Sequence, residues 1–144
     1  MRDGRGSDRE VAAVAAQEQP AVVPHYEGTF CLDDLPTVRR LAAAYGDDAG
    51  LDSARLGDFV LAVNEALTNA FCQGCERARL RLWVSGDGVF CDVLGGRWIS
   101  SLLPSVVRPD DAESLRLWVI QRVCSEVAIF AGTDGTTVQL CMAV

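Results

Sequence analysis

The chain has 144 residues, 49% of them apolar, which suits a single globular domain with a sizeable core rather than a disordered segment. Its net charge of −7 argues against a general nucleic-acid binder, because such proteins present basic surface to the phosphates. All 13 basic residues are arginine, so chemistry that requires a lysine, such as a Schiff base or a Walker-type phosphate loop, is excluded.

The N-terminal segment, residues 1–24, mixes charges with alanine, glutamine and two prolines and lacks a sustained apolar stripe. These features predict a mobile tail ahead of one domain at residues 25–144. The segment is a poor signal peptide, and no apolar run reaches the roughly 18 residues of a membrane span. We therefore expect a cytoplasmic protein, in which the six cysteines are mostly reduced thiols.

The domain begins with a predicted strand and a predicted helix. The strand is "HYEGTF" at residues 25–30. In "LDDLPTVRRLAAAYGDDAG", either Asp33 or Asp34 can cap a helix, the first turn tolerates Pro36, and Gly46 is the expected end.

A second helix is predicted over residues 51–74, where apolar side chains recur at steps of three and four. Asp52 or Ser53 is the expected cap, and Gly74 is the expected stop. The stripe that should face the core consists of Leu56, Phe59, Val60, Val63, Leu67, Ala70 and Phe71.

After the second helix the apolar period changes to two, which indicates strands. Residues 77–85 and 89–95 alternate in this way, and "SGDG" at 85–88 joins them as a hairpin. Three arginines point away from the apolar side of the first strand: Arg77, Arg79 and Arg81. We expect them on a solvated edge or face of the sheet, with the docking of an acidic partner as the alternative.

The last third of the chain predicts a long loop at residues 97–113, a helix over 113–127 and a hairpin over 127–144. The loop contains the apolar run "WISSLLPSVV", which either packs inward or contacts a partner. Strands and helices in this order predict an α/β fold, a two-layer sandwich of a mostly antiparallel, mixed sheet with three helices on one face.

Two polar residues in the second helix raise the question of a functional site. Glu65 and Asn69 lie four residues apart and share one face of the helix, roughly opposite the centre of its apolar stripe. Spacing alone favours an exposed polar face. The pair also suits chemistry, since Mg²⁺ prefers oxygen ligands and an adjacent carboxylate can deprotonate a nucleophile.

Two motifs, in this order along the chain, carry a resemblance to a known superfamily. "LAVNEALTNAFCQG" places a glutamate and then an asparagine near the end of a helix, and the closing segment contains the run Gly135, Thr136, Thr137 and Val138. Over about residues 26–143 the chain is similar to the anti-sigma factor kinases of the GHKL, or Bergerat-fold, ATPase superfamily.

The resemblance implies a Bergerat-type ATP-binding fold with ATP and Mg²⁺ as cofactors. It implies that Asn69 holds the metal, that Glu65 is the catalytic base, and that Thr136 helps to recognise adenine. It also implies nucleotide contacts at Gly95 and Gly96. The partners would be a sigma factor and an anti-anti-sigma protein of the STAS type, bound by a homodimer, with no direct contact to nucleic acid or membrane.

The chain departs from this family at both glycine-rich boxes. In "DVLGGRW" Gly95 and Gly96 remain, but Asp92 stands about three residues before the place of the adenine-reading aspartate, and could substitute only if the alignment shifts. Before the third helix, Ser114 and Arg116 replace glycines whose turn would cradle phosphates through bare backbone. These changes predict weakened or lost ATP binding.

Three functions are consistent with these features. The altered boxes favour an anti-sigma-like regulator that contacts its partner through the first helix, the tail or the long loop. Retention of Glu65 and Asn69 favours an active Mg²⁺-ATP-dependent protein serine/threonine kinase that phosphorylates the anti-anti-sigma partner. The motif "CQGC", Cys72 to Cys75, suggests a thiol or metal sensor, although it closes a helix and lacks a second pair of zinc ligands.

Overall fold

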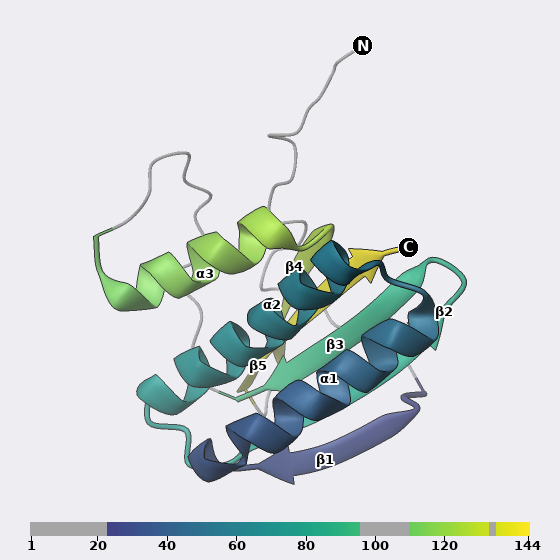
Figure 1. Ribbon diagram of the computed structural model, residues 1–144. Helices are drawn as coiled ribbons and strands as arrows, with labels where there is room; N and C mark the ends of the chain where they lie inside the picture. The colour runs from purple at the N-terminus through teal and green to yellow at the C-terminus, as the bar shows by residue number, and fades with distance from the viewer. Residues whose placement is uncertain (1–22, 96–109, 133–134) are drawn as a thin grey trace.

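The computed structural model describes residues 23–95, 110–132 and 135–144 as one five-stranded sheet covered by three helices (Figure 1). The sheet has the order β1-β2-β3-β5-β4, and each neighbouring pair of strands is antiparallel. The predicted two-layer α/β sandwich is confirmed, with no parallel pair among the described strands. Nearly all of the predicted tail, most of the predicted long loop and the tip of the last hairpin lie outside the described residues.

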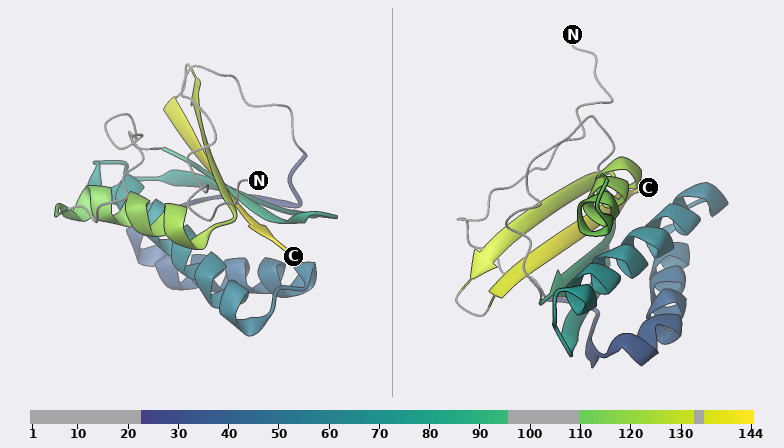
Figure 2. Two further views of the ribbon diagram at one scale, coloured as in Figure 1. Left: turned by 90° about the horizontal axis from the view of Figure 1, so that it is seen from above. Right: turned by 90° about the vertical axis from the view of Figure 1, so that its left-hand side faces the viewer.

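The elements follow the predicted order along the chain. The strands are β1 (Tyr26–Phe30), β2 (Ala78–Ser85), β3 (Gly88–Leu94), β4 (Glu126–Gly132) and β5 (Gly135–Ala143). The helices are α1 (Leu35–Ala49), α2 (Ser53–Cys72) and α3 (Ala112–Val123), with a short 3-10 turn at Leu32–Asp34 before α1. All three helices lie on one face of the sheet, with α2 between α1 and α3 (Figures 1 and 2). Within the described ranges, no helix combines the length and the apolar character needed to cross a membrane.

The core lies between the sheet and the helices. Strand register places buried side chains next to one another in two rows across the sheet, Leu80–Val93–Val138–Ile129 and Leu82–Cys91–Leu140–Val127. From the helical layer, Phe59, Val63 and Leu67 of α2 pack against these rows and are also buried. Since the side chains of a strand alternate between faces, the period of two read from residues 77–85 and 89–95 assigned Leu80, Leu82, Cys91 and Val93 to the correct side.

The first helix runs past its predicted end. Gly46 is buried inside α1, and the helix is instead terminated by Gly50, which takes the left-handed conformation (φ 93°). A β-carbon on Gly46 would lie 2.6 Å from the side chain of Leu56 in α2, so this glycine allows the two helices to approach closely. The prediction that Gly46 ends the helix was wrong because a packing glycine and a terminating glycine look alike in sequence.

The second helix confirms its predicted limits. Asp52 caps α2, and its carboxylate accepts a hydrogen bond from the backbone N–H of Arg55 at 2.9 Å. The helix ends two residues before Gly74, which adopts the left-handed conformation (φ 94°) that stops helices. α1 is attached to α2 by a bond from Arg39 Nη1 to Asn64 Oδ1 at 2.9 Å.

The arginines at and before β2 lie on the face of the sheet away from the core, as predicted, but not on an edge. β2 is flanked by β1 and β3, so it is an inner strand. Arg79 is exposed and pairs with Glu27 of β1, whereas Arg81 is half-buried and pairs with Asp92 of β3. Arg77 is exposed.

A glycine in the sheet, compared with a glycine in a helix, tests how tightly the sheet is packed. Gly88 begins β3 with φ 156°, and a β-carbon there would lie 2.2 Å from the carbonyl oxygen of Met142. We expect Gly88→Ala to lower the free energy of unfolding by about 1–3 kcal/mol, through both strain and overpacking. Urea unfolding followed by circular dichroism measures this change.

Gly57 in α2 is the matched control, because no atom lies within 4 Å of the position that its β-carbon would take. Gly57→Ala should raise the free energy of unfolding by about 0.5–1 kcal/mol, since alanine loses less conformational freedom in a helix. Two variants of equal stability would contradict the close approach of β3 and β5 at Gly88.

Candidate functional site

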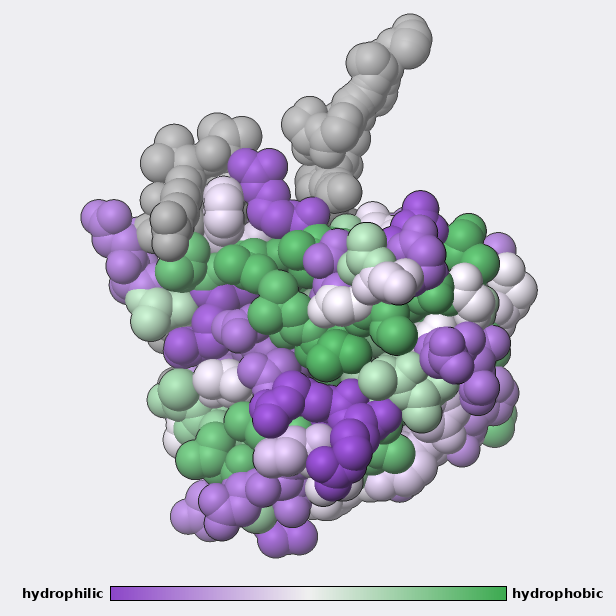
Figure 3. Space-filling view, in the orientation of Figure 1, coloured by the Kyte–Doolittle hydropathy of each residue, from purple (hydrophilic) through white to green (hydrophobic). Residues whose placement is uncertain are grey.

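The residues of the predicted site fall into two groups. The last turns of α2 pack beside the first half of α3 at the left of Figure 1, and a hydrogen bond between Asn69 and Arg116 joins the two helices. The end of β3 and the start of β5 are paired in the sheet, where the N–H of Gly95 donates to the carbonyl of Thr136 at 3.2 Å. In the same orientation, apolar surface gathers around α2 and α3, and hydrophilic surface covers α1 (Figure 3).

Asn69 is fully buried, although its position on the helix predicts solvent exposure. The expectation of an exposed polar face was wrong for this residue because α3 packs along that side of α2. Glu65, one turn earlier, is half-buried. Since a buried amide is destabilising unless it is hydrogen-bonded, the contacts of Asn69 decide what this side chain can do.

The Asn69 amide is held by an arginine of α3. Its Oδ1 accepts a hydrogen bond from Nε of Arg116 at 3.2 Å. A guanidinium can only donate, so the oxygen must face Arg116 and the nitrogen must face elsewhere. That nitrogen, Nδ2, is buried and has no hydrogen-bond partner in the part of the chain that the structure describes. The amide therefore offers a donor, not an acceptor, to any further ligand.

This arrangement does not fit the Mg²⁺ that the resemblance implies at Asn69. A hard cation requires free oxygen ligands, and the single side-chain oxygen of Asn69 faces a positively charged group. The half-buried carboxylate of Glu65 is the remaining oxygen donor of the predicted pair. No cluster of three or more histidine, cysteine, aspartate or glutamate side chains suited to a metal ion occurs within residues 23–95, 110–132 and 135–144.

Gly95 is explained by local packing. It follows β3 with φ 137°, and a β-carbon there would lie 2.8 Å from Sγ of Cys75. Its N–H extends the pairing of β3 with β5 by donating to Thr136, which is half-buried. These contacts require a glycine whether or not a nucleotide binds, and the predicted nucleotide contacts of Gly95 and Thr136 remain predictions. Gly96 lies outside the described residues.

The start of α3, where the resemblance implies a glycine-rich turn, is a capped helix. Asp111 accepts a hydrogen bond from the backbone N–H of Ser114 at 2.9 Å. This bond and one from the Ser114 hydroxyl hold the pKa of the Asp111 carboxyl below its usual value. A phosphate approaching this helix start would meet a carboxylate, with one backbone donor already used. Sequence analysis missed the cap, although an aspartate just before a helix is its usual signal.

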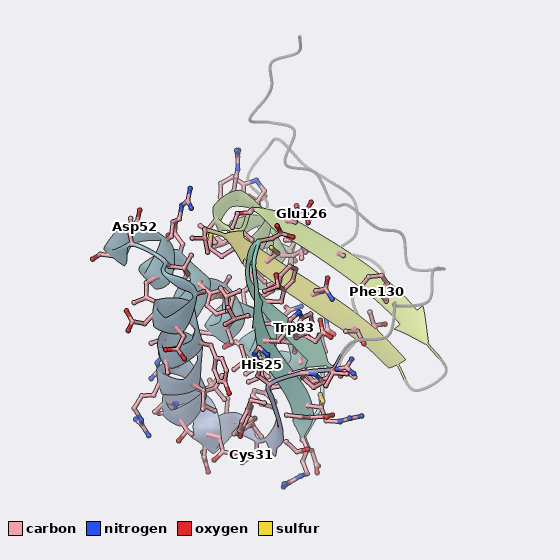
Figure 4. The ribbon with its side chains drawn as sticks, turned by 90° about the vertical axis from the view of Figure 1, so that its right-hand side faces the viewer. His25, Cys31, Asp52, Trp83, Glu126 and Phe130 are labelled. Carbon is pink, nitrogen blue, oxygen red and sulfur yellow. The ribbon has the colours of Figure 1, made fainter. Side chains whose placement is uncertain are left out.

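Asp92 lies on the face of the sheet opposite to the helices and does not substitute for an adenine-reading aspartate. It is fully buried, and its carboxylate contacts Nη2 of Arg81 at 3.2 Å and accepts a bond from Nε2 of Gln139 at 3.1 Å. Register places the three residues side by side across β2, β3 and β5. Beside them on this face lies Trp83 (Figure 4). Its ring stacks on that of Phe90 with centroids 5.3 Å apart.

The two cysteines of the CxxC motif are not joined by a disulfide. Cys72 is exposed, whereas Cys75 is half-buried and its thiol donates to the carbonyl oxygen of Arg77 at 3.0 Å. The pair closes α2, as predicted, rather than opening a helix as in thioredoxin-like motifs.

Comparison with known families gives the site a context. A family model described as the histidine kinase-like ATPase domain matches residues 30–142, from the end of β1 to nearly the end of β5. The match includes Glu65, Asn69 and Arg116. A search of curated proteins found no match.

Arg116→Ala tests the bond to Asn69. The substitution leaves the buried amide oxygen without a donor, and we expect the free energy of unfolding to fall by about 1–3 kcal/mol. Arg40→Ala is the matched control, because Arg40 is exposed on α1 and donates only to Thr37 among the described residues. Urea unfolding that gave the same stability for both variants would show that the Asn69 bond contributes nothing.

Cys72 is the thiol that we expect to react fastest with a disulfide reagent at about pH 8, because it is exposed. Burial raises the pKa of Cys141 to about 11 and the pKa of Cys91 well above its usual range, so these thiols should react at least about tenfold more slowly. Cys72→Ser should remove the fastest phase of the absorbance trace, and all the thiols should react alike in denaturant. An unchanged fast phase in that variant would refute the assignment.

Proposed function

The chain belongs to the histidine kinase-like ATPase domain family, and we propose that it is an anti-sigma-factor-like regulator. It binds a sigma factor, an anti-anti-sigma protein of the STAS type, or both, and its ATP binding is weakened or lost. The observation that carries the proposal is the hydrogen bond between Arg116 and Asn69. The amide that the resemblance assigns to a metal-bound nucleotide is engaged by a side chain of its own chain.

Two further features on the nucleotide side support weakened ATP binding. Asp92 is committed to Arg81 and Gln139 on the far face of the sheet, so it is not a reader of the adenine amino group. A buried hydrogen bond to a charged group is worth about 1.5–3 kcal/mol, so its absence lowers affinity by roughly ten- to a hundredfold. At the start of α3, the Ser114 N–H is used by the Asp111 carboxylate rather than left for a phosphate.

In contrast to the nucleotide side, the surface that would contact a partner protein is intact. The outer side of α1 is exposed and charged, with Arg39, Arg40, Asp47 and Asp48 toward solvent (Figure 3). Such a face supports recognition of a protein partner through charge complementarity. In this proposal the regulator is a homodimer. It works in the cytoplasm, where its partners reside.

A second candidate function is an active Mg²⁺-ATP-dependent protein serine/threonine kinase. The observation that favours it is the half-buried position of Glu65, one turn before Asn69 on the side of α2 nearest to α3. A partly desolvated carboxylate in that position suits a base that accepts the proton of a serine or threonine hydroxyl.

Complex formation tests the regulator. We expect the purified chain to form a saturable complex with at least one sigma factor or STAS-type protein encoded in its source genome. Light scattering after size exclusion measures the complex and the oligomeric state of the chain alone. Its affinity should change by less than about threefold when ATP is added or when Glu65 is replaced by Gln. A full set of these candidates without any complex would remove the proposal.

Phosphate transfer distinguishes the regulator from the kinase. With γ-labelled ATP and Mg²⁺, we expect no label on the STAS-type protein beyond that of a sample without the chain. Label that appears with the wild-type chain and is abolished by Glu65→Ala would establish the kinase instead, since removal of a catalytic base lowers such rates by about 10²–10⁴-fold.

A further inference from the structure

Arg116 donates to the amide oxygen that the resemblance assigns to a divalent metal, and we infer that its guanidinium is the resident cation of this site. With that group seated on Asn69, the chain binds the phosphate groups of a nucleotide-type ligand directly, without Mg²⁺. The inference extends the part of the proposed function that concerns nucleotide binding, and it rests on that part. It is independent of which partner protein is bound.

The first argument is the donor chemistry of the two side chains. The bond to Asn69 uses only Nε of Arg116, and the two terminal nitrogens have no hydrogen-bond partner among the described residues. Asn69 adds its buried Nδ2, which also has no partner in the described part of the chain. The groups left over on these two side chains are therefore donors, which suit an oxyanion, while the half-buried carboxylate of Glu65 one turn earlier is the nearby acceptor. A guanidinium fork matches the oxygens of a phosphate.

The second argument is the exclusion of metal. A divalent cation at Asn69 Oδ1 would have to displace Arg116 from its bond or lie next to its positive charge. Displacement would also leave a half-buried guanidinium without its hydrogen-bonded partner. Glu65 alone cannot compensate, because hard cations in proteins take several oxygen ligands. The bond to Asn69 thus excludes the cation and also holds Arg116 where its guanidinium can donate to an anion.

Calorimetry on the full chain tests both parts of the inference. ATP and inorganic tripolyphosphate are each titrated with excess EDTA and then with excess Mg²⁺. We expect saturable binding in EDTA that is at least as tight as in Mg²⁺, because the uncomplexed phosphates carry more negative charge. Tripolyphosphate separates a phosphate site from one that also requires the base: equal affinities place the recognition in the phosphate chain, and tighter ATP binding adds a contact to the nucleoside.

The variants assign the binding to Arg116. Arg116→Ala should weaken ATP binding in EDTA by about ten- to a hundredfold, the value of a charge-assisted hydrogen bond. Arg116→Lys, which keeps the charge and a donor, should retain part of the affinity and protects the test against misfolding of the alanine variant. Arg55→Ala removes the same charge from the first turn of α2, at the end of that helix away from Asn69, and should leave the affinity unchanged.

A second readout does not depend on nucleotide. In nuclear magnetic resonance spectra, Mn²⁺ broadens the side-chain amide signals of any asparagine that lies next to its binding site. We expect the Asn69 amide, assigned by its loss in Asn69→Ala, to stay sharp when Mn²⁺ is added.

Three results would overturn the inference: broadening of the Asn69 amide by Mn²⁺, ATP binding that Mg²⁺ tightens by about tenfold or more, and the absence of saturable binding to either probe. The last result would leave the regulator standing, since complex formation is measured without nucleotide. Phosphate binding in EDTA without any complex with a sigma factor or STAS-type protein would support this inference and remove the proposed regulator.

Discussion

The burial of Asn69 is the constraint on which the functional end of this domain depends. An amide with no access to solvent destabilises the fold by roughly 1–3 kcal/mol for each polar group left without a partner. α3 can cover that side of α2 only if it brings a donor to the amide oxygen, and Arg116 is that donor. One hydrogen bond therefore links the packing of two helices to the chemistry of the site.

The identity of the donor decides what else the site accepts. A metal ion would leave the asparagine as one of several oxygen ligands and would attract more acceptors around it. A guanidinium differs because it is covalently tethered and donates hydrogen bonds, so it satisfies the amide oxygen without a set of further oxygen ligands. The cap at the start of α3 follows the same logic, since Asp111 satisfies the Ser114 amide from within the chain. At both positions, groups that could bind a ligand are hydrogen-bonded to other residues of the same chain.

A buried charge on the other face of the sheet is stabilised in the same manner. Asp92 has no exposed surface, and it is held between Arg81 on one neighbouring strand and Gln139 on the other. The three side chains meet because β2, β3 and β5 are adjacent in the sheet, not because they are close in sequence. An aspartate committed to this row is part of the framework of the sheet, which explains why its nearness in sequence to a nucleotide box is misleading.

The sequence by itself determined the elements, their order and the core. The periods of 3.6 and 2 reflect the geometry of a single helix or strand, so α2, its cap at Asp52 and the inward side chains of β2 and β3 could be predicted locally. Their spacing likewise placed Glu65 and Asn69 on one face of that helix, and the resemblance supplied only their implied roles. Only the tertiary structure decided that Gly46 separates two helices instead of ending one, and that Asn69 is buried against Arg116. These outcomes depend on which neighbour arrives from a distant part of the chain, and periodicity along one element carries no information about that neighbour.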